Sequence, residues 1–314
     1  MFKKFFPIYV SLLIVLIGFG SYYIYKYNKK ETPIKINISN NIDPCKSPVQ
    51  SKIIETGKKM GVIEIGASGL NAFIITVDET NNYKVDYKEF GESLVLEGFA
   101  TYDDVKEGLK TYLSKIFIKG VSGNNIYFVV SSGALKNNKT KILVESIKKM
   151  GHDIIQVNPE QEAKYLLIAL LPTENYNDSF VVDMGSGNTK ISYIDSTNTI
   201  ISFETYGSKY YQDESIVEDS IQNNINKIIN KIPPQNKQNM FIIGGVPYEL
   251  AKKVCTKNRY VLLKKPENYF ETNDNIKFNS GLKLYDYIYS TSKPQQVIFD
   301  YDANFTMGYL LNQK

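Results

Sequence analysis

The stretch Phe180–Asp195, FVVDMGSGNTKISYID, contains two apolar runs separated by an acid and a glycine-rich turn. Runs of this composition are typical of buried strands, and glycine permits the tight reversal between them. Asp183 ends the first run, where a carboxylate can hold a divalent cation or its water. The backbone N–H groups of such a turn can bind phosphate oxygens. The stretch therefore predicts a β-hairpin with an anion-binding turn.

The chain contains an earlier copy of this pattern at residues 62–77, VIEIGASGLNAFIITV. A constant offset of 119 residues superposes Glu64 on Asp183 and Gly66 on Gly185. A single glycine turn beside an acid is common and is more often a plain hairpin with a solvated side chain. Two copies, each at the start of an α/β half, favour two facing hairpins around one polyphosphate site.

The rest of the sequence alternates between strand and helix patterns, which indicates an α/β fold. Thr101 with Asp104, and Asn158 with Pro159, are typical helix starts. Besides the two hairpins, strands are predicted at 83–90, 125–132, 152–157, 199–207, 239–245 and 295–301. Helices are predicted at 101–120, 140–151, 158–171, 213–232, 246–254, 280–290 and 303–313.

The N-terminal segment from Phe5 to Tyr25 has no charged residue and is long enough to cross a bilayer as a helix. We expect an anchor at 1–30 with a transmembrane helix at 5–25; a cleaved signal peptide is the alternative. Lysines flank both ends, so the sequence does not choose an orientation. A linker is expected at 31–55, followed by two domains at 56–175 and 176–314, since 314 residues suit about two domains.

Composition excludes several classes of function. The net charge is +4 and the lysines are dispersed, which does not favour nucleic-acid binding. The two cysteines, Cys45 and Cys255, are too few and too far apart in sequence to predict a disulfide scaffold or a zinc site. The single histidine, His152, lies between a helical pattern and an apolar run and is not a candidate base.

The order of the motifs resembles the exopolyphosphatase and guanosine pentaphosphate phosphohydrolase (Ppx/GppA) family, over residues 60–312. After the first hairpin, the segments that carry the resemblance are SSGALKNNKTKILVESIKKMG, NPEQEAKYL, VVDMGSGNT, TYGSKYYQDE, FIIGG and NFTMGYLL. That family belongs to the sugar kinase, chaperone and actin superfamily. The resemblance implies duplicated ribonuclease H-like (actin-like ATPase) domains with a cleft between them, here preceded by one transmembrane helix.

The resemblance also implies roles for individual residues. Glu162 is the candidate catalytic base, Asp183 is catalytic, and Glu64 and Asp183 are the candidate Mg²⁺ ligands. The candidate phosphate-binding residues are Gly66, Ser68, Gly69, Lys136, Gly185, Ser186, Gly187, Asn188 and Thr189. Gly244 and Gly245 correspond to the superfamily's segment near a nucleoside.

Two positions depart from the family pattern. The first acid is Glu64 where the family has aspartate, and Lys190 stands where the family usually has glutamate or glutamine. A lysine can bind phosphate, but it cannot replace an acidic metal ligand.

The function implied is a membrane-anchored hydrolase that removes the terminal phosphate of polyphosphate or guanosine pentaphosphate by Mg²⁺-assisted attack of water. Three alternatives stay open: a catalytically degenerate nucleotide- or phosphate-binding module, an ecto-nucleoside triphosphate diphosphohydrolase-like enzyme, and an actin-like or kinase-like phosphotransferase. The expected partners are the substrate and the membrane, with no nucleic acid, and a homodimer is left open. The substrate class slightly favours a cytoplasmic location for the folded part.

Overall fold

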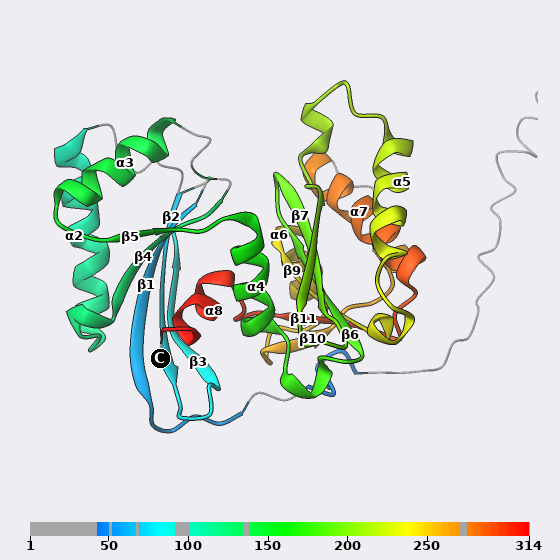
Figure 1. The fold of residues 1–314 in the computed structure, drawn as a ribbon, viewed down its shortest axis with the longest axis horizontal. Coiled ribbons are helices and arrows are strands. Elements are labelled where there is room, and N and C mark those ends of the chain that lie inside the picture. Colours follow the sequence, from blue (N-terminus) through cyan, green and yellow to red (C-terminus); the bar gives the residue numbers. More distant parts are fainter. Residues whose placement is uncertain are drawn as a thin grey trace, which may run out of the picture. The chain divides into compact units, whose positions relative to one another are not determined.

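The computed structural model describes residues 43–49, 52–66, 69–91, 101–132, 134, 138–269 and 275–313 (Figure 1). The predicted anchor at 1–30, its transmembrane helix at 5–25 and most of the linker lie outside the described residues. Within these ranges, no helix is both long and apolar enough to cross a membrane. The described residues from Asp43 onward form one unit.

The first half of this unit is built on a five-stranded mixed sheet. Strands β1 (Lys58–Gly66), β2 (Gly69–Val77) and β3 (Tyr83–Phe90) form an antiparallel meander, as predicted. Strands β4 (Ile126–Val130) and β5 (Ile154–Gln156) add to the other side of β1 in parallel. The resulting strand order is β3-β2-β1-β4-β5.

The second half repeats this plan in a six-stranded sheet. Its strands are β6 (Ser179–Met184), β7 (Asn188–Ile194), β8 (Ile200–Tyr206), β9 (Asn239–Gly244), β10 (Tyr260–Leu262) and β11 (Gln296–Asp300). The order β8-β7-β6-β9-β11 repeats the order and strand directions of the first sheet, and β10 adds an antiparallel edge. The duplication inferred from the two hairpins is therefore a duplication of whole sheets.

All seven predicted helices are present, but α5 begins five residues later and α7 four residues earlier than predicted. They are α2 (Tyr102–Ile118), α3 (Asn138–Lys149), α4 (Pro159–Leu170), α5 (Glu218–Ile229), α6 (Gly245–Val254), α7 (Ile276–Ser292) and α8 (Phe305–Leu311). Short 3-10 helices lie at Gly123–Asn125, Thr173–Asn175, Tyr210–Gln212, Pro234–Lys237 and Pro266–Asn268. Thr101 caps α2 together with Asp104, and Asn158 caps α4 together with Gln161. The capping signals thus located both helix starts.

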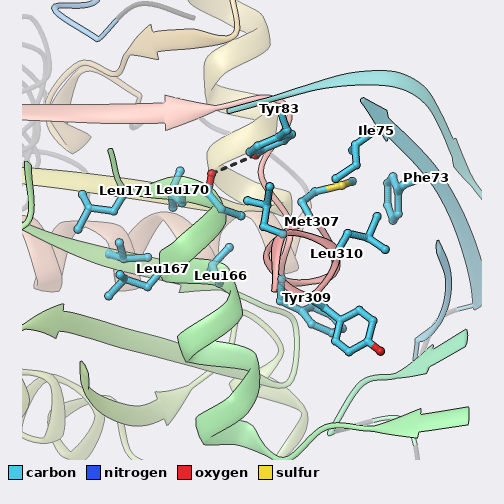
Figure 2. Close-up of a cluster of buried hydrophobic side chains, with 14 of the residues drawn as sticks. Phe73, Ile75, Tyr83, Leu166, Leu167, Leu170, Leu171, Met307, Tyr309 and Leu310 are labelled. Atoms are coloured by element: carbon cyan, nitrogen blue, oxygen red, sulfur yellow. Dashed lines mark hydrogen bonds between the residues drawn. The ribbon is translucent and has the colours of Figure 1, made fainter. Parts of the chain in front are cut away.

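Helices α4 and α8 lie between the two sheets in Figure 1 and share one apolar cluster with both. Figure 2 shows α4 leucines, among them Leu167 and Leu170, beside Met307 and Leu310 of α8 and Phe73 of β2. The C-terminal helix therefore packs against the first sheet, although its residues follow the second. Helices α2 and α3 cover the other face of the first sheet, and α5, α6 and α7 cover the second.

A glycine permits the close approach of α8 to α4. A Cβ atom at Gly308 would lie 1.7 Å from the carbonyl oxygen of Tyr165, which no side chain tolerates. This contact brings the middle of α8 against the middle of α4.

The two cysteines form a disulfide, contrary to the expectation from their spacing. Cys45 and Cys255 have Cα atoms 5.6 Å apart, although 210 residues separate them in sequence. Sequence separation is uninformative here because the fold, not the chain length, sets the distance. The backbone N–H of Leu262 also donates to Pro44 at 3.0 Å, so the segment 43–49, predicted as linker, is attached to the edge of the second sheet.

A buried polar contact joins the first sheet to the second. The guanidinium of Arg259 binds the carboxylate of Asp300 through Nε at 3.0 Å and Nη2 at 2.9 Å, and its Nη2 donates to the hydroxyl of Tyr83 at 2.6 Å. That hydroxyl in turn donates to the carbonyl oxygen of Ala169 in α4 at 3.0 Å, the dashed line in Figure 2. This network connects β3, α4 and β11.

Candidate active site

The two predicted acids occupy equivalent places in the two hairpins. Glu64 of β1 lies opposite Asn71 of β2, and Asp183 of β6 lies opposite Lys190 of β7. The offset of 119 residues that superposes the acids also superposes Asn71 on Lys190. Directly opposite residues of an antiparallel pair project to the same face of the sheet. Each acid therefore has a polar neighbour built into its hairpin, an amide in one half and an ammonium in the other.

Lys190 brings two of the predicted catalytic residues together. Its Nζ lies 2.7 Å from Oε2 of Glu162 and 3.8 Å from Oδ2 of Asp183, with only 10% of its side chain exposed. Burial lowers the pKa of Lys190, but the charges of Asp183 and Glu162 more than offset this, so the pKa lies above its usual value. The amine is therefore a fixed positive charge between two acids.

Glu162 is held from three directions. It lies in the first turn of α4, whose start is set by the cap Asn158. The backbone N–H of Ser132 donates to Oε1 at 2.6 Å, and the Ser132 hydroxyl donates to Oε2 at 2.8 Å. With Lys190 these donors occupy three of the roughly four lone-pair positions of a carboxylate. A proton-accepting role for Glu162 would use the remaining position on Oε1.

Glu64 completes the group of acids. It is 8% exposed, and Nδ2 of Asn304 donates to its Oε2 at 3.1 Å. Burial raises the pKa of Glu64 to about 7; hydrogen bonds from Asn304 and Asn71 oppose the rise, and the charges of Glu162 and Asp183 add to it. Asn304 also caps α8, so the C-terminal helix supplies this contact.

The pKa of Asp183 is also raised above its ordinary value. Burial raises the pKa of Asp183, the nearby Lys190 ammonium lowers it, and Glu162 raises it again. The mutual effects of Glu64, Glu162 and Asp183 mean that residues from β1, α4 and β6 share one electrostatic environment. The structure thus brings together the three acids that the sequence singled out.

The turn of the second hairpin presents free donors. Its backbone carbonyls accept hydrogen bonds from the following loop, Ser208 N–H to Gly185 O at 3.0 Å and Lys209 N–H to Ser186 O at 2.9 Å. A Cβ atom at Gly207 would lie 2.4 Å from the backbone nitrogen of Asn188, so this support needs glycine. In the part of the chain that the structure describes, the N–H groups of Ser186 and Gly187 donate to no acceptor. They are suited to bind an anion.

Two other predicted phosphate ligands direct their side chains elsewhere. Nδ2 of Asn188 donates to Glu204 at 2.8 Å. Thr189 is fully buried on the strand face opposite to Lys190, and its Oγ1 has no hydrogen-bond partner among the described residues. In the first hairpin Gly66 pairs with Gly69, whereas Ser68 and Lys136 lie outside the described residues. The phosphate roles of all these residues stay predictions.

A cavity of about 420 Å³ adjoins the acids. Asp183 and Asn304 line it on one side, and Gly244 and Gly245 line it at the start of α6. Gly244 has φ +124°, and a Cβ there would meet the carbonyl oxygen of Met184 at 2.2 Å, so only glycine fits. Aromatic rings supply much of the remaining wall: Phe73, Phe90, Tyr248, Phe299 and Tyr301. The predicted nucleoside-side glycines therefore do border a cavity beside the acids.

Sequence reasoning missed several contributors to this site. Asn71 was detectable, because it occupies the position of Lys190 in the repeat. Ser132 lies in a motif that carried the resemblance but had no role assigned to it. Asn304 and Gly207 also lie in motifs that carried the resemblance, but they had no role assigned, because they act through contacts with residues distant in sequence.

The residues do not fit the divalent cation that the resemblance implies. Among the described residues, no group of three or more histidine, cysteine, aspartate or glutamate side chains is arranged to hold a metal ion. Mg²⁺ prefers oxygen ligands in an octahedron, whereas the Lys190 ammonium already lies beside two of the three acids.

The described residues form an α/β fold with two mixed sheets, and this fold resembles actin-like ATPase domains. Among solved structures, it is similar to the Ppx/GppA phosphatase of Aquifex aeolicus, with a TM-score of 0.60 and 14% identity over 81% of this chain and 99% of that chain. It is also similar to an exopolyphosphatase of Cytophaga hutchinsonii, with a TM-score of 0.56 and 15% identity over 82% of this chain and 97% of that chain. The sequence matches no protein-family model and no curated protein. The resemblance inferred from the motif order is confirmed at the level of the fold.

Proposed function

We propose that the protein binds a chain of phosphoanhydrides between its two hairpins and hydrolyses the terminal phosphate, as a phosphohydrolase acting on acid anhydrides. The observation that carries the proposal is the convergence of Glu162 and Asp183 on Lys190, beside the open N–H groups of Ser186 and Gly187. The fold shared with exopolyphosphatases supports the same reading.

The chain's own residues suit an in-line displacement. The turn N–H groups bind oxygens of the terminal phosphoryl group, and Lys190 offsets negative charge next to it. Glu162 orients the attacking water and accepts its proton at the free position on Oε1. The water oxygen forms the new bond to phosphorus while the bond to the bridging oxygen breaks, which leaves the shortened chain and inorganic phosphate. Mg²⁺, where it accompanies the substrate, would neutralise phosphate charge.

The cavity favours a nucleoside polyphosphate, for example guanosine pentaphosphate, over a bare polyphosphate chain. Its aromatic rings, Tyr248 among them, line the same cavity as Asp183. A planar base stacks on aromatic side chains, whereas a phosphate chain gains nothing from them. A base in this cavity would direct its phosphates toward the acids.

A second candidate function, binding without turnover, is favoured by one observation. Glu162 already accepts hydrogen bonds from Ser132 and Lys190, which limits its use as a base. In that case the protein would be a phosphate- or nucleotide-binding module on the same fold.

We further propose that residues 5–25 anchor the protein to a membrane and that the folded part faces an oxidising compartment. The Cys45–Cys255 disulfide supports this side, because cytosolic thiols are kept reduced. The substrate class by itself had slightly favoured a cytoplasmic location for the folded part. Fusing alkaline phosphatase or green fluorescent protein to the C-terminus decides between the two sides, since the first is active only outside the cytoplasm and the second fluoresces only within it.

Phosphate release by the purified full-length chain tests the enzymatic proposal. The substrates are polyphosphate, guanosine pentaphosphate and ATP, each with Mg²⁺ and with a chelator. Release that is lost in Asp183→Asn supports the proposal, with Asp153→Asn, an exposed residue in the loop before β5, as the matched control. Binding without release favours the second candidate, and neither binding nor release contradicts both.

A further inference from the structure

We propose that Lys190 takes the place of a divalent cation in this site, so that phosphate chains bind without a bound metal ion. The inference deepens the proposed function and rests on it, because it assigns a charge to the same phosphate end of the site. Its starting point is that the residues of the site do not suit the divalent cation that the resemblance implies.

The position of the ammonium is fixed by the fold. Lys190 lies on β7, which pairs with β6 on one side and β8 on the other, so its backbone has no freedom to withdraw. Its neighbours across the two pairings are both acidic, Asp183 and Glu204, and α4 adds Glu162. The side chain therefore lies between Glu162 and Asp183, and Glu204 is its register partner on β8.

The Lys190 ammonium has N–H groups that are not used by the neighbouring acids. A lysine offers three N–H groups. In the described residues, Lys190 gives one short contact, to Glu162 at 2.7 Å, while Asp183 at 3.8 Å is beyond hydrogen-bond length. Donors therefore remain for the oxygens of a phosphate at the neighbouring turn of Ser186 and Gly187.

The charge balance requires such a cation. A phosphate chain that approaches Glu162 and Asp183 meets like charges, and without a cation the encounter is repulsive. In metal-dependent phosphoryl transfer, the metal supplies this compensation. Here an amine that is 10% exposed offsets one of these negative charges and also repels a metal ion from the same carboxylates.

The first hairpin has a neutral residue at the position that corresponds to Lys190. Asn71 occupies the place that Lys190 has in the second hairpin, and it forms a hydrogen bond with Glu64. A hairpin of this type therefore accommodates asparagine opposite its acid. Lys190→Asn removes the charge in a way that the protein's own repeat already tolerates.

Calorimetric binding of tripolyphosphate to the full-length chain tests the inference, in chelator and in Mg²⁺. We expect the wild type to bind tripolyphosphate under both conditions, with affinities within about threefold of each other. In chelator, the affinity of Lys190→Asn should be at least about tenfold lower than that of the wild type. Lys190→Arg, which keeps the charge, should retain most of the affinity. Lys110→Asn, an exposed lysine paired with Glu107 on α2, is the matched control and should bind as the wild type does.

The outcomes separate this inference from the proposed function. Wild-type binding that requires Mg²⁺, or unchanged binding by folded Lys190→Asn in chelator, overturns the inference and leaves the proposed function standing. Absence of tripolyphosphate and ATP binding under both conditions overturns the proposed function and the inference together. If Lys190→Asn does not fold, Mn²⁺ titration of the wild type followed by electron paramagnetic resonance decides. Absence of a bound ion supports the inference, and a bound ion that Asp183→Asn abolishes contradicts it.

Discussion

Nζ of Lys190 lies 2.7 Å from Oε2 of Glu162, nearer than to Asp183, the residue directly opposite it in the strand register. The lysine thus joins the second hairpin to α4, an element of the first half. This contact connects the candidate base to the hairpin whose turn is the proposed phosphate-binding segment. It also means that changes at either residue affect the other, since each is the other's buried partner.

The first prediction concerns Glu162. In the full-length chain, Glu162→Gln should reduce phosphate release by about 10²- to 10⁴-fold if Glu162 acts as general base. Glutamine keeps an acceptor for Ser132 but cannot take a proton from water. Glu160→Gln, in the same helical turn and exposed, is the matched control and should behave as the wild type. Unchanged release by Glu162→Gln would remove it from the catalytic role.

The second prediction follows from the raised pKa of Glu64. The ordinary value is 4.5, and burial raises the pKa of Glu64 in the folded protein to about 7. Between these values the folded state holds a proton that the unfolded state has lost. The free energy of unfolding therefore falls as the pH rises through this window and levels off above it, by about 3 kcal/mol for this group.

Glu64→Gln should remove that part of the pH dependence. Glutamine can still accept the hydrogen bond of Asn304 and carries no charge at any pH. Urea unfolding of both proteins at about pH 4 and pH 8 measures the difference. We expect the variant to gain stability relative to the wild type at the higher pH only; parallel curves for the two proteins would show that Glu64 ionises normally.

The sequence predicted the two hairpins but not the contact between the second hairpin and α4, and the difference has a physical reason. Glycine turns, apolar runs and capping residues are local signals, and the copy around Glu64 doubled the signal around Asp183. The contact of Glu162 with Lys190 depends on how α4 packs against β7, which no local pattern encodes. Strand β10 was not predicted, although β5, which is equally short, was.

The lack of local signals for long-range contacts also explains why the disulfide and the position of α8 were not predicted. Cys45 and Cys255 pair because residues 43–49 attach to the second sheet, and sequence separation does not report such attachment. Helix α8 was predicted as an element, but its packing on the first sheet depends on Gly308 meeting Tyr165. Its cap Asn304 thereby reaches Glu64, which explains why that contact also escaped prediction.

The third prediction concerns the buried pair of Arg259 and Asp300. Asp300 is 1% exposed, so Arg259→Met would leave an unpaired acid in the interior. Breaking a buried pair in this way costs about 3 to 5 kcal/mol of unfolding free energy. Thermal and urea unfolding measure the loss. The double variant Arg259→Met/Asp300→Leu, which leaves no unpaired charge, should recover part of it; equal loss in both would show that the pair's charge is not the cause.

The fourth prediction concerns the disulfide. It closes a loop of 210 residues, and in the loop-closure description a cross-link of this length adds up to about 5 kcal/mol of stability. Reduction should lower the urea midpoint of the wild type by an amount that Cys45→Ser reproduces. The chain has only two cysteines, so reductant should have no further effect on that variant. An unchanged midpoint on reduction would contradict the pairing.

The last prediction separates the base from the phosphates. Tyr248 lies on α6 at the wall of the cavity, with its ring 5.7 Å from that of Tyr301, and 42% of the residue is exposed. If a nucleobase stacks there, Tyr248→Ala should weaken ATP binding about tenfold, since one stacking contact contributes about 1 to 3 kcal/mol. Tripolyphosphate, which has no base, should bind as before. Tyr102→Ala, an exposed tyrosine on α2 that does not line this cavity, is the control. Equal weakening of both ligands would indicate damage to the phosphate end, and no weakening of either would place the base elsewhere.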